Sequence, residues 1–327
     1  MKNKKLKVII GCDCDHDRPL FNRRLKSGEI SWDGFLSLRN NFDTVRSIIN
    51  EQTGLVPRLI WNIRADKQVK YFHGKYEYCF EEYFKHLHDP NQNDEIAWHH
   101  HMYDEKEGVF FPNFNKEFII EQIPEAYSFI KKYNLRTLHT GWCFNNTYSI
   151  NKYNDVGIKI DYSYLPGVYM IHESGYDYSR VKNFSPFIPS RSDYQKSLKE
   201  SKSNSITEIP TSTVKNRFLS IKNILGNARR KNYNVLNACK YSFIQINANP
   251  VLFKPFVKSF FRDNKDNDYF ITYFHADELL SNDLKSIPAK LLYDKSFMSK
   301  NIIYLINMAK KHNREISFET FKNYTLD

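Results

Sequence analysis

Three consecutive histidines stand out as residues that could bind a metal ion. His99, His100 and His101 follow a short apolar run that is typical of a strand. In an extended strand the side chains alternate between two faces, so His99 and His101 point to one side and His100 to the other. Two imidazoles on one face can chelate one metal ion.

Carboxylates stand at the same spacing of two after the first apolar run, as Asp13 and Asp15. Two histidines, one carboxylate and a spare carboxylate would form a hydrolytic metal site. His275 and Asp161 also follow apolar runs directly. Taken singly, His275 would be an ordinary core or surface histidine, and Asp161 would cap a turn. Because strand ends converge on one rim of an α/β barrel, their joint placement favours a site.

An alternation of strands and helices must position these side chains. Apolar runs predict strands at residues 6–12, 59–64, 96–101, 135–138, 158–160, 206–210, 243–247 and 269–274. Spacings of three and four predict helices at 33–53, 76–87, 116–133 (kinked or restarted at Pro124), 251–261 and about 298–309, with another that ends near residue 154. Such alternation is typical of a parallel α/β sheet or barrel.

No clean linker divides the chain, so residues 1–327 are predicted to form one domain. Residues 167–206 are rich in Ser, Tyr, Pro and Asn and predict a loop insertion. Residues 214–240 are basic and predicted to be largely helical, and a helical C-terminal extension is expected over about 281–327.

The chain carries a formal charge of +11, which is spread along its length. Its densest basic clusters, Arg229-Arg230-Lys231 and Lys310-Lys311, do not form an Arg-rich recognition stripe. We therefore expect attraction to an anionic substrate or to a membrane surface, and no nucleic-acid partner.

Five scattered cysteines, one pair of them as Cys12-Asp13-Cys14, argue against a secreted disulfide scaffold. The apolar run near the N-terminus is too short for a signal peptide, and no stretch approaches the roughly 18 apolar residues of a membrane span. The protein is thus predicted to be soluble and cytoplasmic.

These motifs resemble the polysaccharide deacetylases of carbohydrate esterase family 4, which share the NodB-homology domain. The resemblance is greatest to a divergent branch associated with surface-polysaccharide biosynthesis, and it covers roughly residues 6–280. The matching stretches are Gly11-Cys12-Asp13-Cys14-Asp15, Glu95-Ile96-Ala97-Trp98-His99-His100-His101, Gly157-Ile158-Lys159-Ile160-Asp161-Tyr162-Ser163 and Phe274-His275-Ala276-Asp277-Glu278.

The chain departs from the family pattern at several positions. Cys14 separates the two aspartates, and Tyr103 occupies the usual place of the second metal histidine, which makes His101 the expected ligand instead. Ala276 replaces the usual proline after the last histidine. The family's Arg-x-Pro-Tyr motif appears here as His139-Thr140-Gly141-Trp142.

The resemblance implies an α/β fold, a distorted (β/α) barrel of about seven parallel strands. It implies Asp15, His99 and His101 as ligands of a divalent metal, for which zinc is expected, and an N-acetylated sugar as substrate. Asp13 would act as the base and His275, oriented by Asp277 or Glu278, as the acid. Arg64, Trp142 and Asp161 are candidate residues of the substrate groove. The expected basic surface and cytoplasmic location suit a nucleotide-linked or lipid-linked sugar.

Two other hypotheses use the same residues. A metal-dependent phosphoesterase or a sugar-nucleotide transferase would act on a phosphate through the Asp-x-Asp stretch and the histidines. A catalytically altered, carbohydrate-binding member of the fold would bind sugar without turnover, and its binding would survive Asp13→Asn and His275→Ala.

Overall fold

The computed structural model describes residues 4–18, 29–170, 176–178, 184–197, 206–215, 241–264 and 266–324. Most of the basic stretch that was predicted to be helical, and with it the Arg229-Arg230-Lys231 cluster and Cys239, lies outside the described residues.

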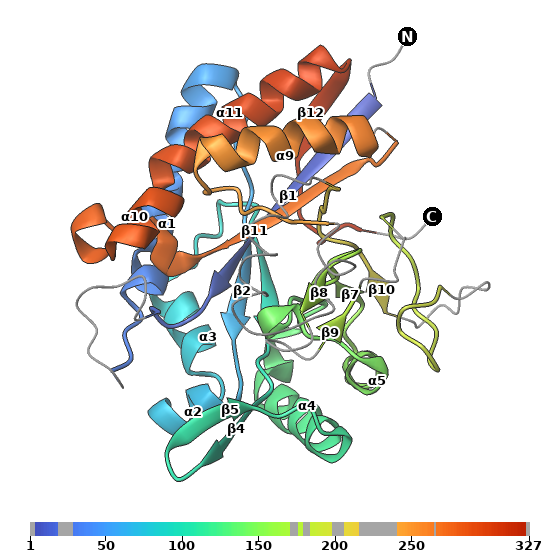
Figure 1. Ribbon diagram of the computed structural model, residues 1–327. Coiled ribbons are helices and arrows are strands. Elements are labelled where there is room, and N and C mark those ends of the chain that lie inside the picture. Colours follow the sequence, from blue (N-terminus) through green and yellow to red (C-terminus); the bar gives the residue numbers. More distant parts are fainter. Residues whose placement is uncertain are drawn as a thin grey trace.

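The molecule is built on one curled sheet (Figure 1). Seven strands pair in parallel in the order β10-β7-β6-β3-β2-β1-β11, and an eighth strand, β12, pairs with β1. This confirms the predicted distorted barrel of about seven parallel strands. The strands of the sheet are β1 (Lys4–Cys14), β2 (Ile60–Arg64), β3 (Glu95–His99), β6 (Thr137–Leu138), β7 (Ile160–Asp161), β10 (Thr207–Glu208), β11 (Tyr269–His275) and β12 (Arg314–Phe318).

A short bridge connects the two ends of the seven-strand path. The segment after β10 reaches β11, where the Ser212 N–H donates to the Ile271 carbonyl at 3.0 Å and the Ile271 N–H donates to the Ser212 hydroxyl at 2.9 Å. Because this bridge is short, the sheet closes only partly, which makes the barrel distorted rather than regular.

The side chains that face the lumen change in character along each strand. Aliphatic residues lie deep in the barrel, among them Ile9, Ile60, Ala97 and Ile271. Strand side chains repeat every two residues, so the same rows continue towards the carboxyl ends with polar residues. Those polar continuations are Asp13 and Asp15, Asn62 and Arg64, His99 and His101, and His275.

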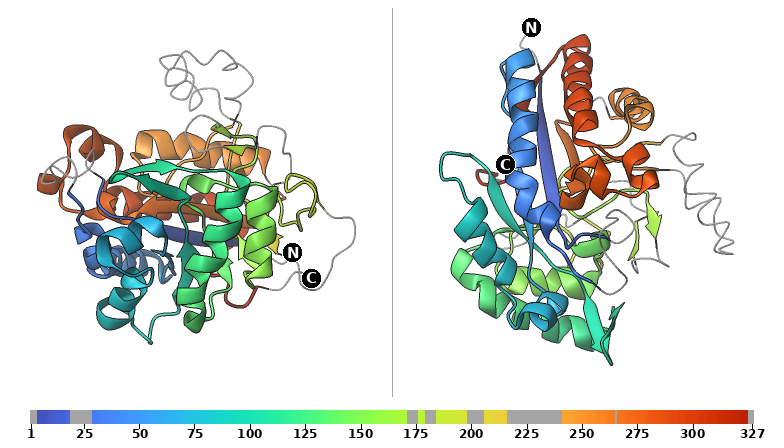
Figure 2. Two further views of the ribbon diagram at one scale, coloured as in Figure 1. Left: turned by 90° about the horizontal axis from the view of Figure 1, so that it is seen from below. Right: turned by 90° about the vertical axis from the view of Figure 1, so that its left-hand side faces the viewer.

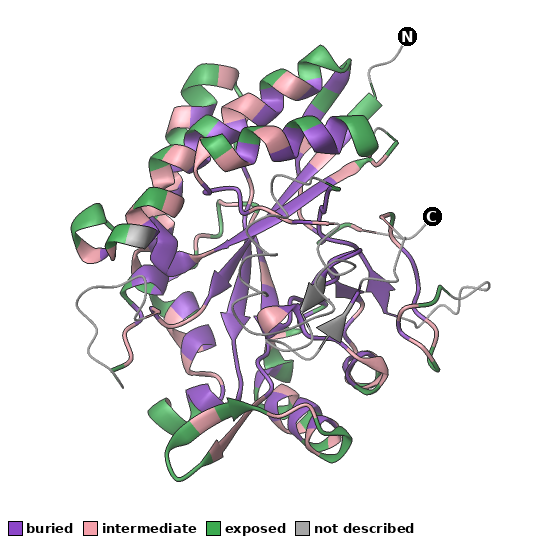
Figure 3. Ribbon diagram, in the orientation of Figure 1, coloured by how far each residue is buried: buried purple, intermediate pink, exposed green. Residues whose placement is uncertain are grey.

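Helices cover the outer face of the sheet, and the larger apolar core lies between the two (Figure 3). Figure 1 shows α1, α9 and α11 beside β1 and β11, α10 at the left of the view, and α2 to α5 near the other strands. The helices are α1 (Asp33–Thr53), α2 (Lys67–His73), α3 (Tyr78–Glu82) continued by the π-helical turn η1 (Tyr83–Leu87), α4 (Lys116–Ile130), α5 (Thr147–Asp155), α9 (Pro250–Asp263), α10 (Ile287–Leu292) and α11 (Lys295–Lys311).

Two local features differ from the sequence-based expectation, and a third decides between two alternatives that it left open. Residues 243–247 form no strand, and the carbonyls of Ile246 and Ala248 accept hydrogen bonds from the Asn301 amide instead of from a neighbouring strand. The C-terminal extension contains α10 and α11 but ends in strand β12, so it is not purely helical. Helix α4 runs through Pro124 as one element, without a restart.

A β-hairpin that the sequence reading did not predict follows the histidine strand. Strands β4 (Tyr103–Lys106) and β5 (Val109–Pro112) pair in antiparallel register, and the turn residues Glu107 and Gly108 both have positive φ. The hairpin projects beyond the carboxyl ends of the sheet strands (Figure 2). The predicted insertion at 167–206 contains only the short pair β8 (Tyr169–Met170) and β9 (Tyr176–Asp177) among its described residues.

None of the helices in the described ranges combines the length and the apolar character that crossing a bilayer would require. The prediction of a single domain remains a prediction.

Candidate metal centre and active site

A pocket of about 370 Å³ opens at the carboxyl ends of β1, β2, β3 and β11. These four strands bring together residues that lie more than 250 positions apart in the chain. The lining includes Asp13, Asp15, Arg64, His99, His101, Trp142 and His275, which are seven of the eight residues predicted for the site.

Asp15, His99 and His101 form a compact group of potential metal ligands. The Nε2 atoms of His99 and His101 lie 3.1 Å apart, and Asp15 Oδ1 lies 3.6 Å from the first and 3.1 Å from the second. One donor atom from each residue thus lies within 4.8 Å of the others. Two imidazole nitrogens and one carboxylate oxygen are a donor set that zinc accepts, with further positions open.

The two imidazoles are oriented in different ways. His99 Nδ1 lies 2.6 Å from the His139 carbonyl, so Nδ1 carries the proton and Nε2 is left as an acceptor. The His101 ring is held by packing: it stacks on Tyr103 with centroids 5.3 Å apart, and Gly141 lies against its other side. A Cβ at position 141 would collide with the His101 ring, which explains the glycine there.

The charges of this group suit a cation. Burial, together with the nearby Arg64 guanidinium, lowers the pKa of His101 to about 4, so the ring is neutral at pH 7. Burial opposes ionisation of Asp15, but interactions with His101 and His99 hold its pKa well below the usual value. A neutral imidazole and an ionised carboxylate are the forms that bind metals.

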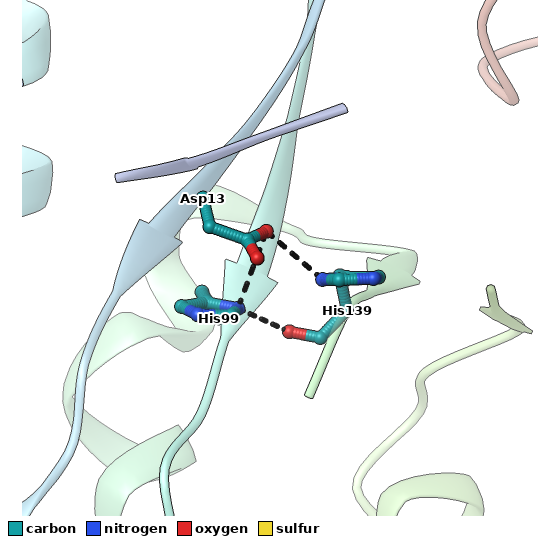
Figure 4. A group of neighbouring side chains, drawn as sticks. All are labelled: Asp13, His99 and His139. Carbon is teal, nitrogen blue, oxygen red and sulfur yellow. Dashed lines mark hydrogen bonds and ion pairs between the residues drawn. The ribbon is translucent and has the colours of Figure 1, made fainter. Parts of the chain in front are cut away.

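Asp13 lies near His99, whose Nδ1 is 3.9 Å from Asp13 Oδ1, and also contacts His139 (Figure 4). Its Oδ1 accepts a hydrogen bond from the Asn62 amide at 2.8 Å and lies 2.9 Å from His139 Nδ1. Although burial opposes ionisation, His139 and His99 lower the pKa of Asp13 far below its usual value. Asp13 in turn raises the pKa of the buried His139 to about 10, so this pair is ionic at neutral pH.

His275 faces the two aspartates from β11. Its Nε2 lies 3.8 Å from Asp13 Oδ2 and 3.8 Å from Asp15 Oδ2. Behind the ring, Nδ1 lies 3.7 Å from Glu278 Oε1 and 3.0 Å from the Gln245 amide nitrogen. Burial and Arg18 favour the neutral ring, yet Glu278 raises the pKa of His275 above its ordinary value.

Of the two acidic residues that follow His275, the structure places Glu278 behind the imidazole. The Asp277 carboxylate instead accepts hydrogen bonds from the Arg18 guanidinium at 3.0 and 2.7 Å. Arg18 also contacts Glu278 at 2.8 Å, so one arginine links both carboxylates to the wall of the pocket.

Arg64 and Trp142 both line the pocket, but they are held differently. The Arg64 side chain is 1% exposed and is ion-paired with Asp66 and, at 3.3 Å, with Asp15. Trp142 is partly exposed and packs edge-on against His101 and Tyr103, with centroids 4.7 Å apart in each case. Their contact with substrate remains a prediction.

Asp161 is the predicted groove residue that the structure does not bring to the pocket. Ile160 points into the lumen, so the next side chain in β7 points out of the barrel. The Asp161 carboxylate is fully buried and accepts hydrogen bonds from Asn145 and Ser163, at 2.5 Å each. Asp161 is therefore a structural residue and does not line the predicted substrate groove.

The predicted strand at 96–101 ends at His99 in the structure, but the side chains of the histidine stretch alternate as expected. His100 points away from the pocket, stacks on Trp98 with centroids 4.6 Å apart, and lies 3.0 Å from the Tyr153 hydroxyl. Burial lowers the pKa of His100 to about 3, so it is a neutral core histidine.

The sequence reading assigned no role to His139 or Asn62, the two closest partners of Asp13. Both carry a signal that could have been used. His139 follows a short apolar run, as the other candidates do, and Asn62 is a polar residue inside a strand that is otherwise apolar up to Ile63.

No protein-family model matches the chain, and no curated protein matches its sequence. Among solved structures, the chain is similar to a candidate polysaccharide deacetylase from Mycobacterium smegmatis, with 11% identity, a TM-score of 0.41, and coverage of 99% of this chain and 96% of that chain. A candidate polysaccharide deacetylase involved in O-antigen biosynthesis in Bordetella bronchiseptica shows 11% identity and a TM-score of 0.30, over 64% of this chain and 65% of that chain, just under two thirds.

A 4-alpha-glucanotransferase from Thermococcus litoralis is also similar, with 10% identity, a TM-score of 0.41, and coverage of 98% of this chain and 41% of that chain. All three superpose only loosely on the chain, so none of them carries an argument about its function.

Proposed function

We propose that the protein is a metal-dependent hydrolase that removes an acetyl or similar acyl group from an N-acetylated sugar, in the assembly of a surface polysaccharide. The main support is that the donor atoms of Asp15, His99 and His101 lie within 4.8 Å of one another and that all three residues line one pocket. An ionised carboxylate, Asp13, and a histidine with a raised pKa, His275, face the same pocket. A base and an acid of this kind match the two proton transfers of amide or ester hydrolysis.

The pocket residues divide these tasks among themselves. Asp15, His99 and His101 would hold the metal, for which zinc fits the donor set. A bound divalent ion supplies polarisation of the acyl carbonyl and a more acidic water, which a base as weak as Asp13 requires. Asp13 would accept a proton from the attacking water, and the neighbouring His139 would keep Asp13 ionised beforehand.

His275 provides the second proton transfer. Glu278 lies behind its Nδ1 and favours the protonated ring, so the Nε2 proton points into the pocket towards the aspartates. From there it can pass to the leaving amine or alkoxide as the carbon–nitrogen or carbon–oxygen bond breaks. Trp142 and Tyr103, which line the pocket beside His101, would then contact the sugar ring.

The alternative of chemistry on a phosphate finds less support in the pocket. Each of the two arginines that line it is ion-paired with two carboxylates. Arg64 pairs with Asp66 and Asp15. Arg18 pairs with Asp277 and Glu278. A phosphate site would need cationic side chains whose charge is still available to the substrate.

The decisive experiment measures bound metal and acetate release together. The purified protein should bind about one equivalent of zinc and release acetate from N-acetylated sugars, and a chelator should stop the release. His101→Gln should lose both properties. His100→Gln, which changes the adjacent histidine on the opposite face, is the matched control and should keep both.

Two results would contradict this function. A parent protein that binds no divalent metal, even when zinc is supplied in excess, would exclude the metal-dependent mechanism. A protein that binds zinc and sugar but releases no acetate from any N-acetylated sugar would favour the carbohydrate-binding alternative instead.

A further inference from the structure

Helices α9, α10 and α11 carry most of the net charge of the chain. They contribute +2, +1 and +4 respectively, so that these three helices supply seven of the eleven net positive charges. Asp263 is the single carboxylate within the three helices, and it is ion-paired with its neighbour Arg262. The remaining charge therefore comes from lysines.

The fold brings this charge together, although it is spread along the sequence. Helices α9 and α11 pack against each other (Figure 1), and the Lys254 ammonium lies 5.6 Å from the centre of the Tyr304 ring. Helix α10 joins the start of α9, because the Asn249 N–H donates to the Leu292 carbonyl at 2.8 Å and the Asn249 amide donates to the Leu291 carbonyl at 3.0 Å. The three helices thus form one continuous surface.

Exposed aliphatic side chains lie where α9 meets α10. Of the large apolar residues in the described chain, four are more than 60% exposed, and three of these are Val251 at 69%, Ile287 at 62% and Leu291 at 64%. Ile287 and Leu291 are four residues apart in α10 and therefore project from one face. Val251 lies in the first turn of α9, beside the end of α10. Apolar side chains that gather in this way on a surface mark an interaction site.

Lysines surround these aliphatic side chains. Lys254 and Lys258 follow Val251 at spacings of three and seven, which places all three residues on the exposed face of α9. Lys290 precedes Leu291 in α10. In the part of the chain that the structure describes, none of these three lysines forms an ion pair, so their charge is available to an anionic partner. We define the docking patch as Val251, Ile287, Leu291, Lys254, Lys258 and Lys290.

The composition of the docking patch favours an anionic lipid bilayer over other anionic partners. A bilayer takes up aliphatic side chains at the boundary of its headgroups and acyl chains, and its acidic lipids attract the lysines around them. A nucleic acid would instead be bound by arginines and by rings that stack on bases. Arg262 is the only arginine of the three helices, and it is already paired with Asp263.

We propose that the docking patch binds the surface of an anionic lipid bilayer. Val251, Ile287 and Leu291 enter the headgroup region, and the lysines contact the acidic headgroups. A small apolar cluster alone gives weak membrane affinity, and stable binding needs the electrostatic attraction as a second contribution. The inference is independent of the proposed function, because no residue of the docking patch lines the candidate active site.

Co-sedimentation of the purified protein with lipid vesicles tests this proposal. The probes are vesicles of phosphatidylcholine alone and vesicles of phosphatidylcholine with about one quarter phosphatidylglycerol. The protein should bind the anionic vesicles at least about 10-fold more tightly than the neutral ones. A salt concentration of about 0.5 M should remove most of this difference, because it screens the charges.

Two double variants separate the apolar and the electrostatic contributions. Ile287→Ser/Leu291→Ser should weaken binding to the anionic vesicles at least about 10-fold, because the inserted side chains are lost. Lys254→Gln/Lys258→Gln should weaken the same binding by about 10-fold or more. Thermal unfolding shows whether each variant folds, and either variant alone suffices for the test if the other does not fold.

Matched controls separate the docking patch from a general loss of apolar surface or of charge. Val109→Ser changes the fourth highly exposed apolar residue, which is 65% exposed and lies in the β4–β5 hairpin. Lys70→Gln/Lys75→Gln removes the same net charge at two lysines that are ion-paired with Glu125 and Glu81. Both controls should bind the anionic vesicles as the parent does.

Three outcomes would overturn the proposal. The first is a parent protein that binds neither kind of vesicle, or that binds both kinds equally. The second is vesicle binding that both variants of the docking patch retain. The third is binding of duplex DNA that Lys254→Gln/Lys258→Gln abolishes, in a protein that binds no vesicles, which would assign the surface to a nucleic acid.

Discussion

Two pairs of buried carboxylates lie at the carboxyl edge of the sheet, and they differ in charge. Asp13 and Asp15 follow each other on the lumen side of β1, whereas Asp161 and Glu208 are register partners on the outer side of β7 and β10. Burial raises the pKa of Asp161, and it raises the pKa of Glu208 well above its usual value. The pKa values of Asp13 and Asp15 are instead lowered.

The difference arises from the partners, because all four carboxyl groups are largely removed from water. Asp13 has His139 at 2.9 Å, and Asp15 has Arg64 at 3.3 Å as well as two histidines. Asp161 lies beside Glu208, and the hydrogen-bond donors around it, such as Asn145, are neutral. A buried carboxylate without a cation keeps its proton, and one with a cation is ready for chemistry.

The largest expected effect separates the two pairs by activity. Asp13→Asn should lower kcat for acetate release by about 10²–10⁴-fold, because it removes the group that accepts a proton. Glu208→Gln, an equivalent replacement in the other pair, should change kcat less than about twofold because its carboxyl is already protonated. Steady-state kinetics measure both. Equal losses in the two variants would show that the pairs do not differ in function.

The next effect concerns the cation beside Asp13. His139→Gln removes the charge but keeps a hydrogen-bond donor, so the pKa of Asp13 should rise. The free energy of unfolding should fall by about 1–3 kcal/mol. The acid limb of the kcat/KM profile should then move to higher pH.

The same substitution predicts a change of stability with pH. The pKa of His139 is raised to about 10 from an ordinary 6.5. Its contribution to the free energy of unfolding is therefore complete below pH 6.5 and is lost as the pH rises towards 10. His139→Gln should therefore flatten the fall in Tm between pH 7 and 10. An unchanged slope in that window would mean that His139 is neutral in the folded protein.

The smallest effect concerns the protonated pair. The pKa of Glu208 lies well above its ordinary 4.5, so the folded protein holds a proton that the unfolded chain releases, and stability falls as the pH rises above about 4.5. Glu208→Gln should remove part of this slope and raise the free energy of unfolding at pH 8 relative to the parent. Chemical denaturation at several pH values measures it. A variant that is less stable at pH 8 would indicate an ionised Glu208 in the native state.

Much of the fold could be predicted because long elements have strong periodicity. Helix α1 and strands β1, β2 and β11 appear close to their expected ranges, and the spacing of two placed Asp13 with Asp15 and His99 with His101. These pairs lie in one row regardless of where the strand begins, so the prediction needed no knowledge of the sheet.

The errors occur where a local pattern does not show which face of the sheet a side chain takes or which partner a segment has. Ile158, Lys159, Ile160 and Asp161 alternate between apolar and polar, but β7 has only two residues and both faces of the sheet are covered, so the pattern did not show that Asp161 would face outwards. Phe243 and Ile244 begin an apolar run that has the composition of a strand, but the carbonyl of Ile246 is bound by Asn301, which lies more than 50 residues away. A contact of that range is not visible in a local pattern.

The pairing of β1 sets an order for the folding of the site. The strand that carries Asp13 pairs with β11 along one edge, while β12 pairs with its first half and β2 with its second half. Its partners β11 and β12 begin at Tyr269 and Arg314, and both must be synthesised before β1 is complete. During synthesis the aspartates therefore emerge early, whereas β1 gains its last strand partner only after residue 318 has been translated.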